Sequence, residues 1–492
     1  MTLSRSPHVA VIGAGISGLS TAFYLQRLRP DARIALFEGH TRAGGNIRTE
    51  ARSGFVLDAG PDSFIKTKPA VLELCRELEL EGELLGAAAE RTVHVAHGGA
   101  LEPLPEGLIL GAPTRLRPLL ETPLLSALGK LRMLAELLLP ADFGRRWRVE
   151  VGGDESITEF LTRRFGAEAT QRLVAPMLAG IYAGDASQLS IEATFPMFPN
   201  LERRFGSVIL GLIQGRIGRP GERASAGLWS RLRAACRWLS APQEPVAASP
   251  FVSFRAGMSA LIDALAAKLA PGSLRRGVPV RALEHRSDGR GWKVSTQSST
   301  YFANAVVIAT PAHVAAKLVP SEMLADELAS LRYASTATVF FGGEQRHLER
   351  KGEGYGFVVP PGEGELRAAT WVSNKWPGRA PAGSFLIRAF LGGAGSELDV
   401  RGSSDRVLLD VARLELERFV GRMGEARITR VYRHLSTNPQ PSVGHRLALE
   451  RVRGILDTMP RLALTGAAYD GVGIPDCIRQ GRAVAEKLAR AL

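Results

Sequence analysis

A glycine-rich turn near the N-terminus carries the clearest chemical signal in the sequence. It follows an apolar run over 8–12, which suits a buried parallel strand, and it precedes a helical stretch from Leu19 to about Leu28. Gly13 permits a tight turn, Gly15 lets the backbone approach a pyrophosphate, and Gly18 lets the helix pack closely on the strand. The turn consists of Gly13, Ala14, Gly15, Ile16, Ser17 and Gly18. This spacing predicts that dinucleotide phosphates bind at the helix N-terminus.

An acidic residue in the expected place supports this interpretation. A second strand is predicted over 33–38, and it ends in Glu38, about 20 residues after Gly18. A carboxylate at this position accepts hydrogen bonds from the ribose hydroxyls of an adenosine. A glycine-rich turn without any ligand remains the structural alternative.

Further segments suit a dinucleotide larger than NAD. Two adjacent glycines and an arginine follow Glu38 in the run 42–48, and another glycine-containing segment lies at 58–63. The run 465–478 joins a glycine-rich turn to a helix start, and a buried strand ends at 309–311. These segments resemble the FAD-binding amine-oxidase superfamily. The resemblance implies FAD as cofactor, held in addition to the turn by Glu38, Gly39, Arg42, Gly44, Gly45, Asn46, Gly60, Pro61, Asp62, Ser63, Val280, Thr310, Val472, Gly473 and Ile474.

Three other runs, 179–185, 354–360 and 391–393, are more specific. In these runs, and over nearly its whole length, the chain is similar to the oxygen-dependent protoporphyrinogen oxidases and their coproporphyrinogen-oxidising relatives. The similarity implies a three-step, six-electron dehydrogenation of a porphyrinogen in haem biosynthesis, with molecular oxygen as acceptor and hydrogen peroxide as product. It also implies that the tetrapyrrole substrate contacts Gly180, Tyr355 and Phe390.

The sequence departs from these relatives at two places. Ile109 stands where some of them have an arginine that reaches a substrate propionate, so the carboxylate partner is not identified. His434 and the run 438–441 stand where relatives often have a tryptophan and an Ile-Pro-Gln-Tyr segment, so no flavin contact is assigned to His434. No catalytic residue is assigned, because the sequence shows no nucleophile, triad or carboxylate pair of recognisable spacing.

Composition limits the class of protein and its partners. The 492 residues are 45% hydrophobic and 23% charged, as in an ordinary globular protein of two or three domains. Lysine and arginine number 62 against 49 acidic residues, and the net charge of +13 favours an anionic substrate or lipid headgroups. No aromatic and basic motif indicates nucleic-acid binding. The three scattered cysteines and the histidine spacing argue against disulfides and against a metal site, and they favour a cytoplasmic protein.

A leucine-rich stretch raises the question of a membrane contact. Leucines recur at helical spacing over 124–138 with basic residues between them, and Arg145, Arg146 and Arg148 follow. A helix packed on its own domain and an interfacial helix at the inner face of the cell membrane are both kept as interpretations. A homodimer is also left open. No run of about 20 apolar residues predicts a spanning helix.

The predicted architecture is an α/β, two-lobed flavoprotein with a discontinuous, Rossmann-like FAD domain, a mixed-sheet substrate domain and a helical cap. The expected segments are the FAD domain over 1–89, 251–320 and 451–492, a helical cap or membrane-contact region over 90–214, a basic linker over 215–250, and the substrate domain over 321–450. Two other functions stay open. One is a flavin amine oxidase or polyene desaturase of the same superfamily, and the other is a non-enzymatic flavin-binding protein at a membrane surface.

Overall fold

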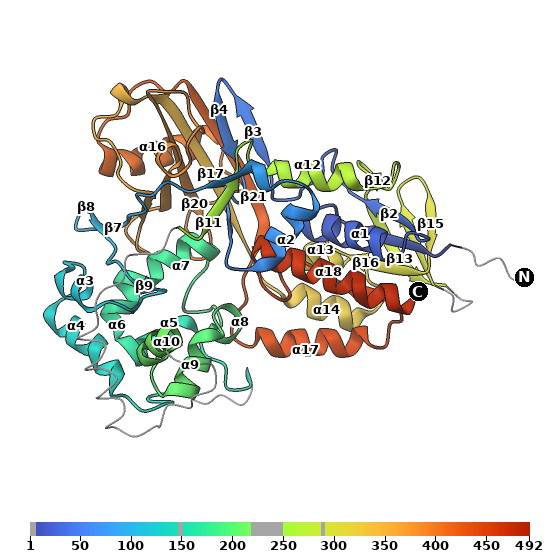
Figure 1. Ribbon diagram of the computed structural model, residues 1–492, viewed down its shortest axis with the longest axis horizontal. Coiled ribbons are helices and arrows are strands. Elements are labelled where there is room, and N and C mark those ends of the chain that lie inside the picture. Colours follow the sequence, from blue (N-terminus) through green and yellow to red (C-terminus); the bar gives the residue numbers. More distant parts are fainter. Residues whose placement is uncertain (1–5, 146–150, 218–248, 287–290) are drawn as a thin grey trace, which may run out of the picture. The chain divides into compact units, whose positions relative to one another are not determined.

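The computed structural model describes residues 6–145, 151–217, 249–286 and 291–492 (Figure 1). The chain divides into two compact units, each made of separated stretches. Unit 1 comprises Met1–Ala87, Ser249–Tyr333 and Leu447–Leu492, and unit 2 comprises Ala88–Ala248 and Ala334–Arg446. Most of the basic linker expected over 215–250 lies outside the described residues.

Unit 1 is built on a parallel five-stranded sheet. Its strand order is β12 (Leu274–Arg275), β2 (Arg33–Phe37), β1 (His8–Ile12), β16 (Ala305–Ile308) and β22 (Leu462–Leu464). The inner strands are almost wholly apolar because both faces of the sheet are covered. Val9 and Val11 belong to the core on one face, whereas Ala10 and Ile12 belong to the core on the other.

Helices and small sheets cover the two faces of this parallel sheet. The first core is closed by α1 (Ile16–Leu28), α2 (Pro69–Glu77), α12 (Ser259–Lys268) and α18 (Ile474–Ala491). The second is closed by α13 (Ala312–Ala315), α14 (Glu322–Ser330), α17 (His445–Leu456) and the antiparallel strands β13 (Val280–His285), β14 (Trp292–Thr296) and β15 (Thr300–Ala303). The shorter elements are β3 (Thr49–Arg52), β4 (Phe55–Asp58), β5 (Phe64–Ile65), η1 (Glu81–Glu83), β6 (Leu84–Gly86) and β11 (Phe251–Phe254).

Two predicted elements of unit 1 differ from the observed ones. The first helix begins at Ile16 rather than Leu19, so the second half of the glycine-rich turn is already helical. The sequence also predicts a short strand over 277–280, and this prediction is wrong, because β13 begins only at Val280. Gly277 has a φ of +68°, and Pro279 has no N–H group to give to a strand ladder.

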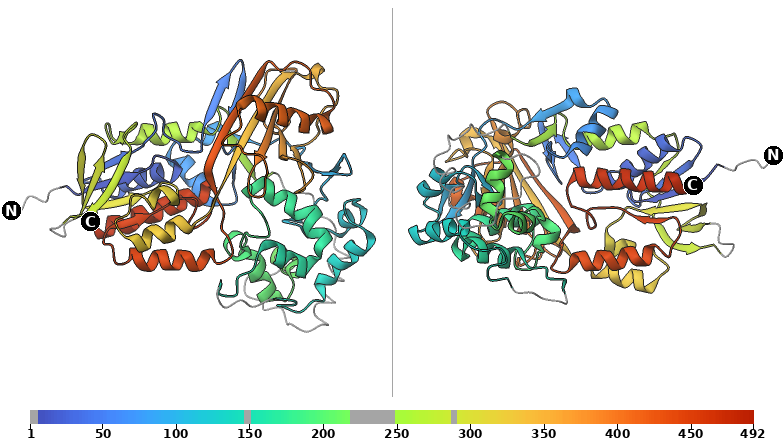
Figure 2. Two further views of the ribbon diagram at one scale, coloured as in Figure 1. Left: turned by 180° about the vertical axis from the view of Figure 1, so that it is seen from behind. Right: turned by 60° about the horizontal axis from the view of Figure 1, so that its bottom comes forward.

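Unit 2 contains a mixed seven-stranded sheet. Its order is β21 (Ile428–Pro439), β17 (Tyr333–Glu344), β20 (Ser384–Gly392), β19 (Leu366–Trp371), β18 (Gly356–Val358), β7 (Val93–His97) and β8 (Ala100–Pro103). β7 and β18 run parallel, whereas β20 is antiparallel to both of its neighbours. The helix α16 (Asp405–Val420), orange in Figure 2, lies against one face, where Val339, Ile387 and Leu416 share a core.

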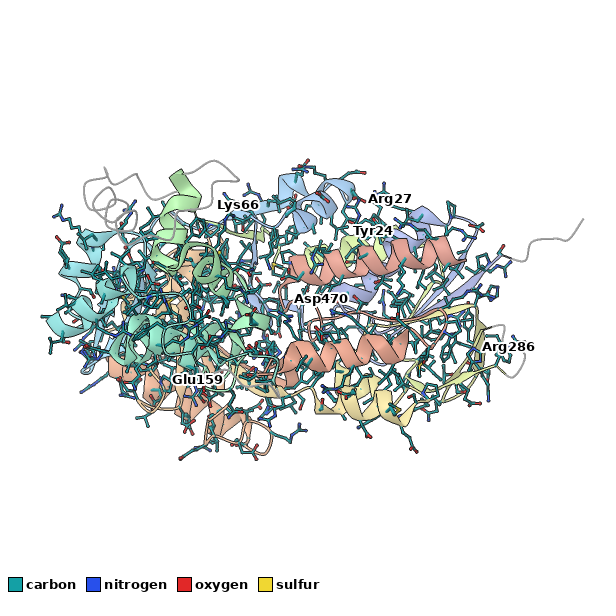
Figure 3. All side chains as sticks on the ribbon, turned by 90° about the horizontal axis from the view of Figure 1, so that it is seen from below. Tyr24, Arg27, Lys66, Glu159, Arg286 and Asp470 are labelled. Carbon is teal, nitrogen blue, oxygen red and sulfur yellow. The ribbon has the colours of Figure 1, made fainter. Side chains whose placement is uncertain are left out.

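A helical layer packs on the other face of this sheet. Its elements are α3 (Leu116–Glu121), α4 (Ala127–Leu134), η2 (Ala135–Leu137), α5 (Ile157–Phe165), α6 (Ala167–Ala169), η4 (Thr170–Val174), α7 (Ala175–Tyr182), α8 (Ile191–Thr194), α9 (Met197–Phe205) and α10 (Val208–Ile217). The layer shares its core with Val358 and Ala368 of the sheet. Glu159, labelled in Figure 3, forms a capping box with Ser156 that starts α5.

The range 90–214, expected to be helical, also holds strands. It contains β7, β8, β9 (Leu108–Ile109) and β10 (Ala112–Pro113). The leucine stretch over 124–138 forms a shorter helix than its spacing predicts, because α4 starts after the N-cap Ser126 and gives way to η2 after Leu134. Leu124 and Leu125 are buried ahead of this helix, whereas Leu128 and Leu131 are exposed on it.

Buried charges hold the helical layer together. Arg164 and Glu136 are both fully buried and form an ion pair, in which the Arg164 Nε–H donates to Glu136 Oε1 at 3.0 Å. Glu136 also accepts from the Ser207 hydroxyl at 2.5 Å and from the Val208 N–H at 2.8 Å. The carboxylate therefore joins η2, α5 and the start of α10 at one point.

Candidate cofactor site and candidate substrate face

The glycine-rich turn of unit 1 has the geometry that its spacing predicts. Gly13 follows β1 with a φ of +99°, and its N–H donates to the Phe37 carbonyl at 2.7 Å. A Cβ atom on Gly18 would lie 1.9 Å from the Gly13 carbonyl oxygen, so only glycine allows this approach of helix and turn. A Cβ atom on Gly15 would have no heavy atom of the described chain within 4 Å. The space beside Gly15 is therefore open at the N-terminus of α1.

Glu38 is fixed by backbone groups at the end of β2. Its Oε2 accepts the Ala14 N–H at 2.8 Å, and its Oε1 accepts the His40 N–H at 2.9 Å. The side chain is buried. Each carboxylate oxygen has a second lone pair, so the group can accept a further hydrogen bond while it stays bound to the turn.

Arg42 holds its own loop. Its guanidinium group donates to the Gly45 carbonyl at 2.6 Å and to the Ile47 carbonyl at 3.2 Å. Burial and the nearby Arg48 lower the pKa of Arg42. The loop in turn reaches the turn after β1, because the Gly44 N–H donates to the Ala14 carbonyl at 2.8 Å. From the sequence, Arg42 is predicted to lie beside the pyrophosphate. In the structure, the observed contacts of its guanidinium group are to backbone carbonyls of its own loop.

The segment with Gly60 packs tightly against the same loop. A Cβ atom on Gly60 would lie 1.8 Å from the Asn46 carbonyl oxygen, and the Ala59 N–H donates to the Arg48 carbonyl at 2.8 Å. Pro61 follows, and Asp62 accepts a hydrogen bond from the Ser63 hydroxyl at 2.7 Å. The runs 42–48 and 58–63 are thus brought together, as their shared assignment to one ligand requires.

Buried hydroxyl groups gather where three parallel strands end. A Cβ atom on Gly13 would lie 3.1 Å from Thr310 Cγ2, which places the ends of β1 and β16 side by side. Thr465, which follows β22, donates its N–H to the Ile308 carbonyl at 3.0 Å. The hydroxyl oxygens of Thr310 and Thr465 are buried and have no hydrogen-bond partner within the described ranges. Thr465 was missed by the sequence prediction, although it directly precedes the glycine-rich C-terminal turn.

The remaining predicted cofactor residues lie near these strand ends. Val280 begins β13, just after Val278, whose N–H donates to the Glu38 carbonyl at 2.8 Å. A Cβ atom on Gly39 would lie 3.6 Å from Pro279 Cβ. Gly473 is the N-cap of α18, preceded by Val472 and followed by Ile474. Asp470, labelled in Figure 3, lies in the turn before α18 and forms an ion pair with Arg453 at 2.6 Å.

Tyr469 is the aromatic residue of the run 465–477, where an amine oxidase of this superfamily would present aromatic residues to the front of a flavin. It lies near the strand ends, because a Cβ atom on Gly466 would lie 3.7 Å from Tyr469 Cε2 and 3.9 Å from the Thr310 carbonyl oxygen. Its side chain packs against the second core of unit 1. Burial raises the pKa of its hydroxyl, and the neighbouring Tyr333 raises it further. The side chain is partly buried, and its hydroxyl has no hydrogen-bond partner within the described ranges.

These features fit a flavin dinucleotide. The open space at Gly15 lies at a helix N-terminus, where orphan amides and the helix dipole favour a pyrophosphate. The Glu38 carboxylate retains lone pairs that can accept hydrogen bonds from hydroxyl groups, and the buried hydroxyls of Thr310 and Thr465 are donors that the described chain leaves unused. Buried polar groups normally have partners, so a polar ligand at the strand ends accounts for both hydroxyls.

The predicted substrate residues lie in unit 2, and two of them share one face of the large sheet. A Cβ atom on Gly180, in α7, would lie 3.5 Å from Val358 Cγ1 and 3.8 Å from Ala368 Cβ. Ala368 is the register partner of Phe390 in β20. Gly180 and Phe390 are therefore neighbours across the interface of α7 and the sheet.

Tyr355 is held separately, directly before β18. Its hydroxyl donates to the Ala88 carbonyl at 2.6 Å, and its backbone N–H donates to the Thr92 carbonyl at 2.8 Å. The Lys375 Nζ atom lies 5.9 Å from the ring centroid. Ile109, at the place of the missing arginine, packs against the core of the helical layer. No cationic side chain is predicted from the sequence on the face of the large sheet that carries Phe390. The structure places Arg388 on this face.

Comparisons with known proteins agree with this arrangement. The family described as flavin containing amine oxidoreductase matches residues 16–489. The chain is 31% identical to a coproporphyrinogen III oxidase of Bacillus subtilis, over 97% of this chain and 96% of that protein. It is 32% identical to the human protoporphyrinogen oxidase, over 97% of each chain.

Solved structures show the same fold. A protein from Exiguobacterium sp. 255-15, provisionally named a protoporphyrinogen oxidase, has a TM-score of 0.82 at 30% identity and covers 99% of both chains. A UDP-galactopyranose mutase has a TM-score of 0.68 at 15% identity, which shows a shared fold alone. The chain belongs to the flavin containing amine oxidoreductase family, among its porphyrinogen oxidases, and is an FAD-dependent oxidoreductase.

Proposed function

We propose that this protein oxidises a porphyrinogen to the porphyrin, with molecular oxygen as the final acceptor and hydrogen peroxide as the second product. The observation that carries the proposal is the match over 97% of the chain to relatives named for coproporphyrinogen III and protoporphyrinogen oxidation. When bound, FAD supplies the redox chemistry by accepting hydrogen from the reduced ring. The protein's own residues then have to bind the dinucleotide and orient the macrocycle.

The binding of FAD is assigned to the strand ends of unit 1. The backbone around Gly15 and the α1 N-terminus receive the pyrophosphate, and Glu38 accepts from the ribose. The loops that carry Gly44, Gly45 and Gly60 bring backbone close to the dinucleotide, with Arg42 as the residue that holds the loop in shape. The N-terminus of α18 at Val472, Gly473 and Ile474 presents amide groups, and Thr465 joins Thr310 as a hydroxyl donor.

Orientation of the macrocycle is assigned to the sheet of unit 2. Phe390 supplies an aromatic surface, and Gly180 leaves room beside it because a side chain there would approach Val358 and Ala368. Tyr355 supplies a second, rigid ring, since its hydroxyl is anchored to Ala88. An aromatic and mostly apolar surface suits the large, mostly apolar ring of a tetrapyrrole.

Turnover with two porphyrinogens side by side tests the proposal. Protein loaded with FAD is mixed in air with coproporphyrinogen III or with protoporphyrinogen IX, and porphyrin fluorescence and hydrogen peroxide are both followed. We expect porphyrin and peroxide to form together with at least one substrate, well above the rate of spontaneous oxidation. Porphyrin formation that needs an added quinone would contradict oxygen as acceptor.

The same assay separates the alternatives. A primary amine and a diamine are run as further substrates, and we expect no peroxide from either. Peroxide from an amine without turnover of a porphyrinogen would replace the proposal by an amine oxidase. Stable binding of FAD without turnover of any of these compounds would indicate a non-enzymatic flavoprotein.

A contact with anionic membranes is proposed for the helical layer. Leu128, Leu131 and Leu138 are 78%, 65% and 49% exposed; the first two lie on α4, and Leu138 directly follows η2. Lys130 flanks these leucines, so apolar and cationic groups lie together, as in interfacial helices, whereas the Arg132 guanidinium group donates to the Arg163 and Arg164 carbonyls of α5. Within the described ranges, no helix combines the length and apolar character needed to cross a membrane.

Replacing Leu128 and Leu131 by aspartate should weaken binding to vesicles rich in anionic lipid by about tenfold or more, because each insertion of a leucine contributes about 1.5–3 kcal/mol. Flotation with the vesicles measures the bound fraction. Leu414→Asp is the matched control, since Leu414 is 69% exposed on α16, away from the patch. Unchanged flotation together with a switch from dimer to monomer would instead identify the patch as a contact between two copies.

A further inference from the structure

Arg388 lies on the substrate face of the unit 2 sheet. Along β20, Ile387, Ala389 and Leu391 point into the core that α16 covers. Side chains alternate along a strand, so Arg388 and Phe390 point to the opposite face. The partly buried Phe390 ring packs against the core of the helical layer, which confirms this direction. A cation therefore stands next to the aromatic residue assigned to the substrate.

The guanidinium group of Arg388 lies close to two aromatic rings, and the residue is almost fully buried. Its Cζ atom lies 4.5 Å from the centroid of the Phe390 ring and 5.6 Å from that of Phe340. The residue is only 5% exposed. Stacking uses the flat face of a guanidinium, whereas its N–H groups point outward along the edge in a fork that matches a carboxylate. Contacts with two aromatic rings hold the guanidinium group at this part of the sheet face.

The sheet register connects Arg388 to the other substrate residues. Arg388 pairs with Phe340 on one side and with Thr370 on the other. Two pairs further along, and so on the same face, Phe390 is opposite Ala368, against which Gly180 of α7 packs. Arg388 therefore lies two register positions along β20 from the place where Gly180 and Phe390 meet.

We propose that Arg388 binds a carboxylate of the porphyrinogen. This inference rests on the proposed function and deepens it, because it names the residue that recognises the acidic groups of the ring. It also accounts for Ile109, which stands where some relatives have a carboxylate-binding arginine and packs here in an apolar core. The cation comes from a central strand of the sheet rather than from the loop before β9.

Binding of a redox-inert ligand tests the role of Arg388 without turnover. The probe is coproporphyrin III, compared with its methyl ester in the same detergent, and fluorescence quenching of FAD-loaded protein gives both dissociation constants. The wild type should prefer the free acid by about 10- to 100-fold, as expected for a charge-assisted bidentate contact. In Arg388→Gln this preference should fall to about two- to threefold, with the affinity for the ester unchanged.

A matched control lies on the opposite face of the same sheet. Arg413 of α16 stacks on Phe341 at 5.5 Å and donates to the Met423 carbonyl at 2.8 Å. Arg413→Gln removes a stacked cation of the same kind, and it should leave the preference for the acid as in the wild type. A second variant, Arg388→Lys, keeps the charge without the fork, and it should retain part of the preference even if Arg388→Gln does not fold.

The outcomes separate this inference from the function on which it rests. Suppose that the wild type turns over a porphyrinogen and that Arg388→Gln keeps the full preference for the acid. Arg388 is then not the carboxylate partner. The same conclusion follows from a full preference in Arg388→Lys if only that variant folds. A preference lost equally in Arg413→Gln would also overturn the inference, because the effect would then be structural. If the wild type turns over no porphyrinogen at all, the proposed function itself fails.

Discussion

Gly15→Ala should weaken FAD binding by about tenfold or more and leave the apoprotein as stable as the wild type. Gly15 has φ −71° and ψ 179°, an extended conformation that alanine adopts without strain. An added Cβ would meet no heavy atom of the described chain within 4 Å. The methyl group would instead occupy the open space assigned to the pyrophosphate, where it keeps phosphate oxygens away from the amides of α1.

Gly18→Ala makes a sharp contrast three residues later. Its Cβ would lie 1.9 Å from the Gly13 carbonyl oxygen, a backbone atom that cannot rotate away. The helix and the turn must separate, and overpacking of this kind costs about 1–3 kcal/mol of stability before any cofactor is added. The apoprotein itself should therefore unfold at a lower urea concentration.

Equilibrium titration with FAD and urea unfolding of both apoproteins distinguish the two effects. We expect Gly15→Ala to change only the FAD dissociation constant and Gly18→Ala to change the stability of the apoprotein as well. Normal FAD affinity in Gly15→Ala would remove the pyrophosphate from this turn. Such a result would leave the family assignment intact and would make the proposed binding geometry wrong.

Glu136→Ala should destabilise unit 2 by about 3–5 kcal/mol, which is the usual cost of leaving one partner of a buried ion pair without the other. Both Glu136 and Arg164 are fully buried. The carboxylate also accepts from Ser207 and from the N–H groups of Val208 and Ile209, so its removal leaves several buried donors unsatisfied. The helical layer should consequently open at lower urea and lose its protection against hydrogen exchange.

An exposed ion pair of the same layer provides the control. Arg117 and Glu121 form an i,i+4 pair in α3 at 2.7 Å, with side chains 77% and 62% exposed. Exposed pairs of this kind contribute little, so Glu121→Ala should leave the urea midpoint unchanged. Equal losses of stability in Glu136→Ala and Glu121→Ala would show that burial does not determine how much Glu136 contributes to stability. Hydrogen exchange of the amides of α5 and α10 gives the local measurement.

Much of the nucleotide-binding half could be predicted from the sequence because its signals are local. The strand at 8–12, the glycine spacing and Glu38 all belong to one short βαβ unit, in which each residue type is required by the backbone next to it. The observed contacts of Gly13, Gly18 and Glu38 follow this pattern. The family was predicted correctly for the same reason, since its motifs are short runs of neighbouring residues.

Other local predictions were wrong where tertiary contacts overrode the pattern. The leucines over 124–138 have helical spacing, but Ser126 caps a helix that ends at Leu134, and the buried Glu136 draws the next turn towards Arg164. A strand is predicted over 277–280, but β13 starts at Val280, three residues after the predicted start, so the apolar residue Val278 precedes the strand. In each case the spacing of hydrophobic residues does not show at which residue the helix or strand begins or ends, because contacts with a neighbouring element determine that residue.

The sequence by itself determined the family, the flavin and the turn around Gly15, because these depend on residues that are close along the chain. Only the tertiary structure placed Thr465 beside Thr310, and Arg388 on the same sheet face as Phe390, two register positions from the pair that Gly180 contacts. Strand pairing and helix packing join segments that are far apart in the sequence, and no local pattern records which residues then face one another. The cation assigned to the substrate carboxylate was missed for this physical reason.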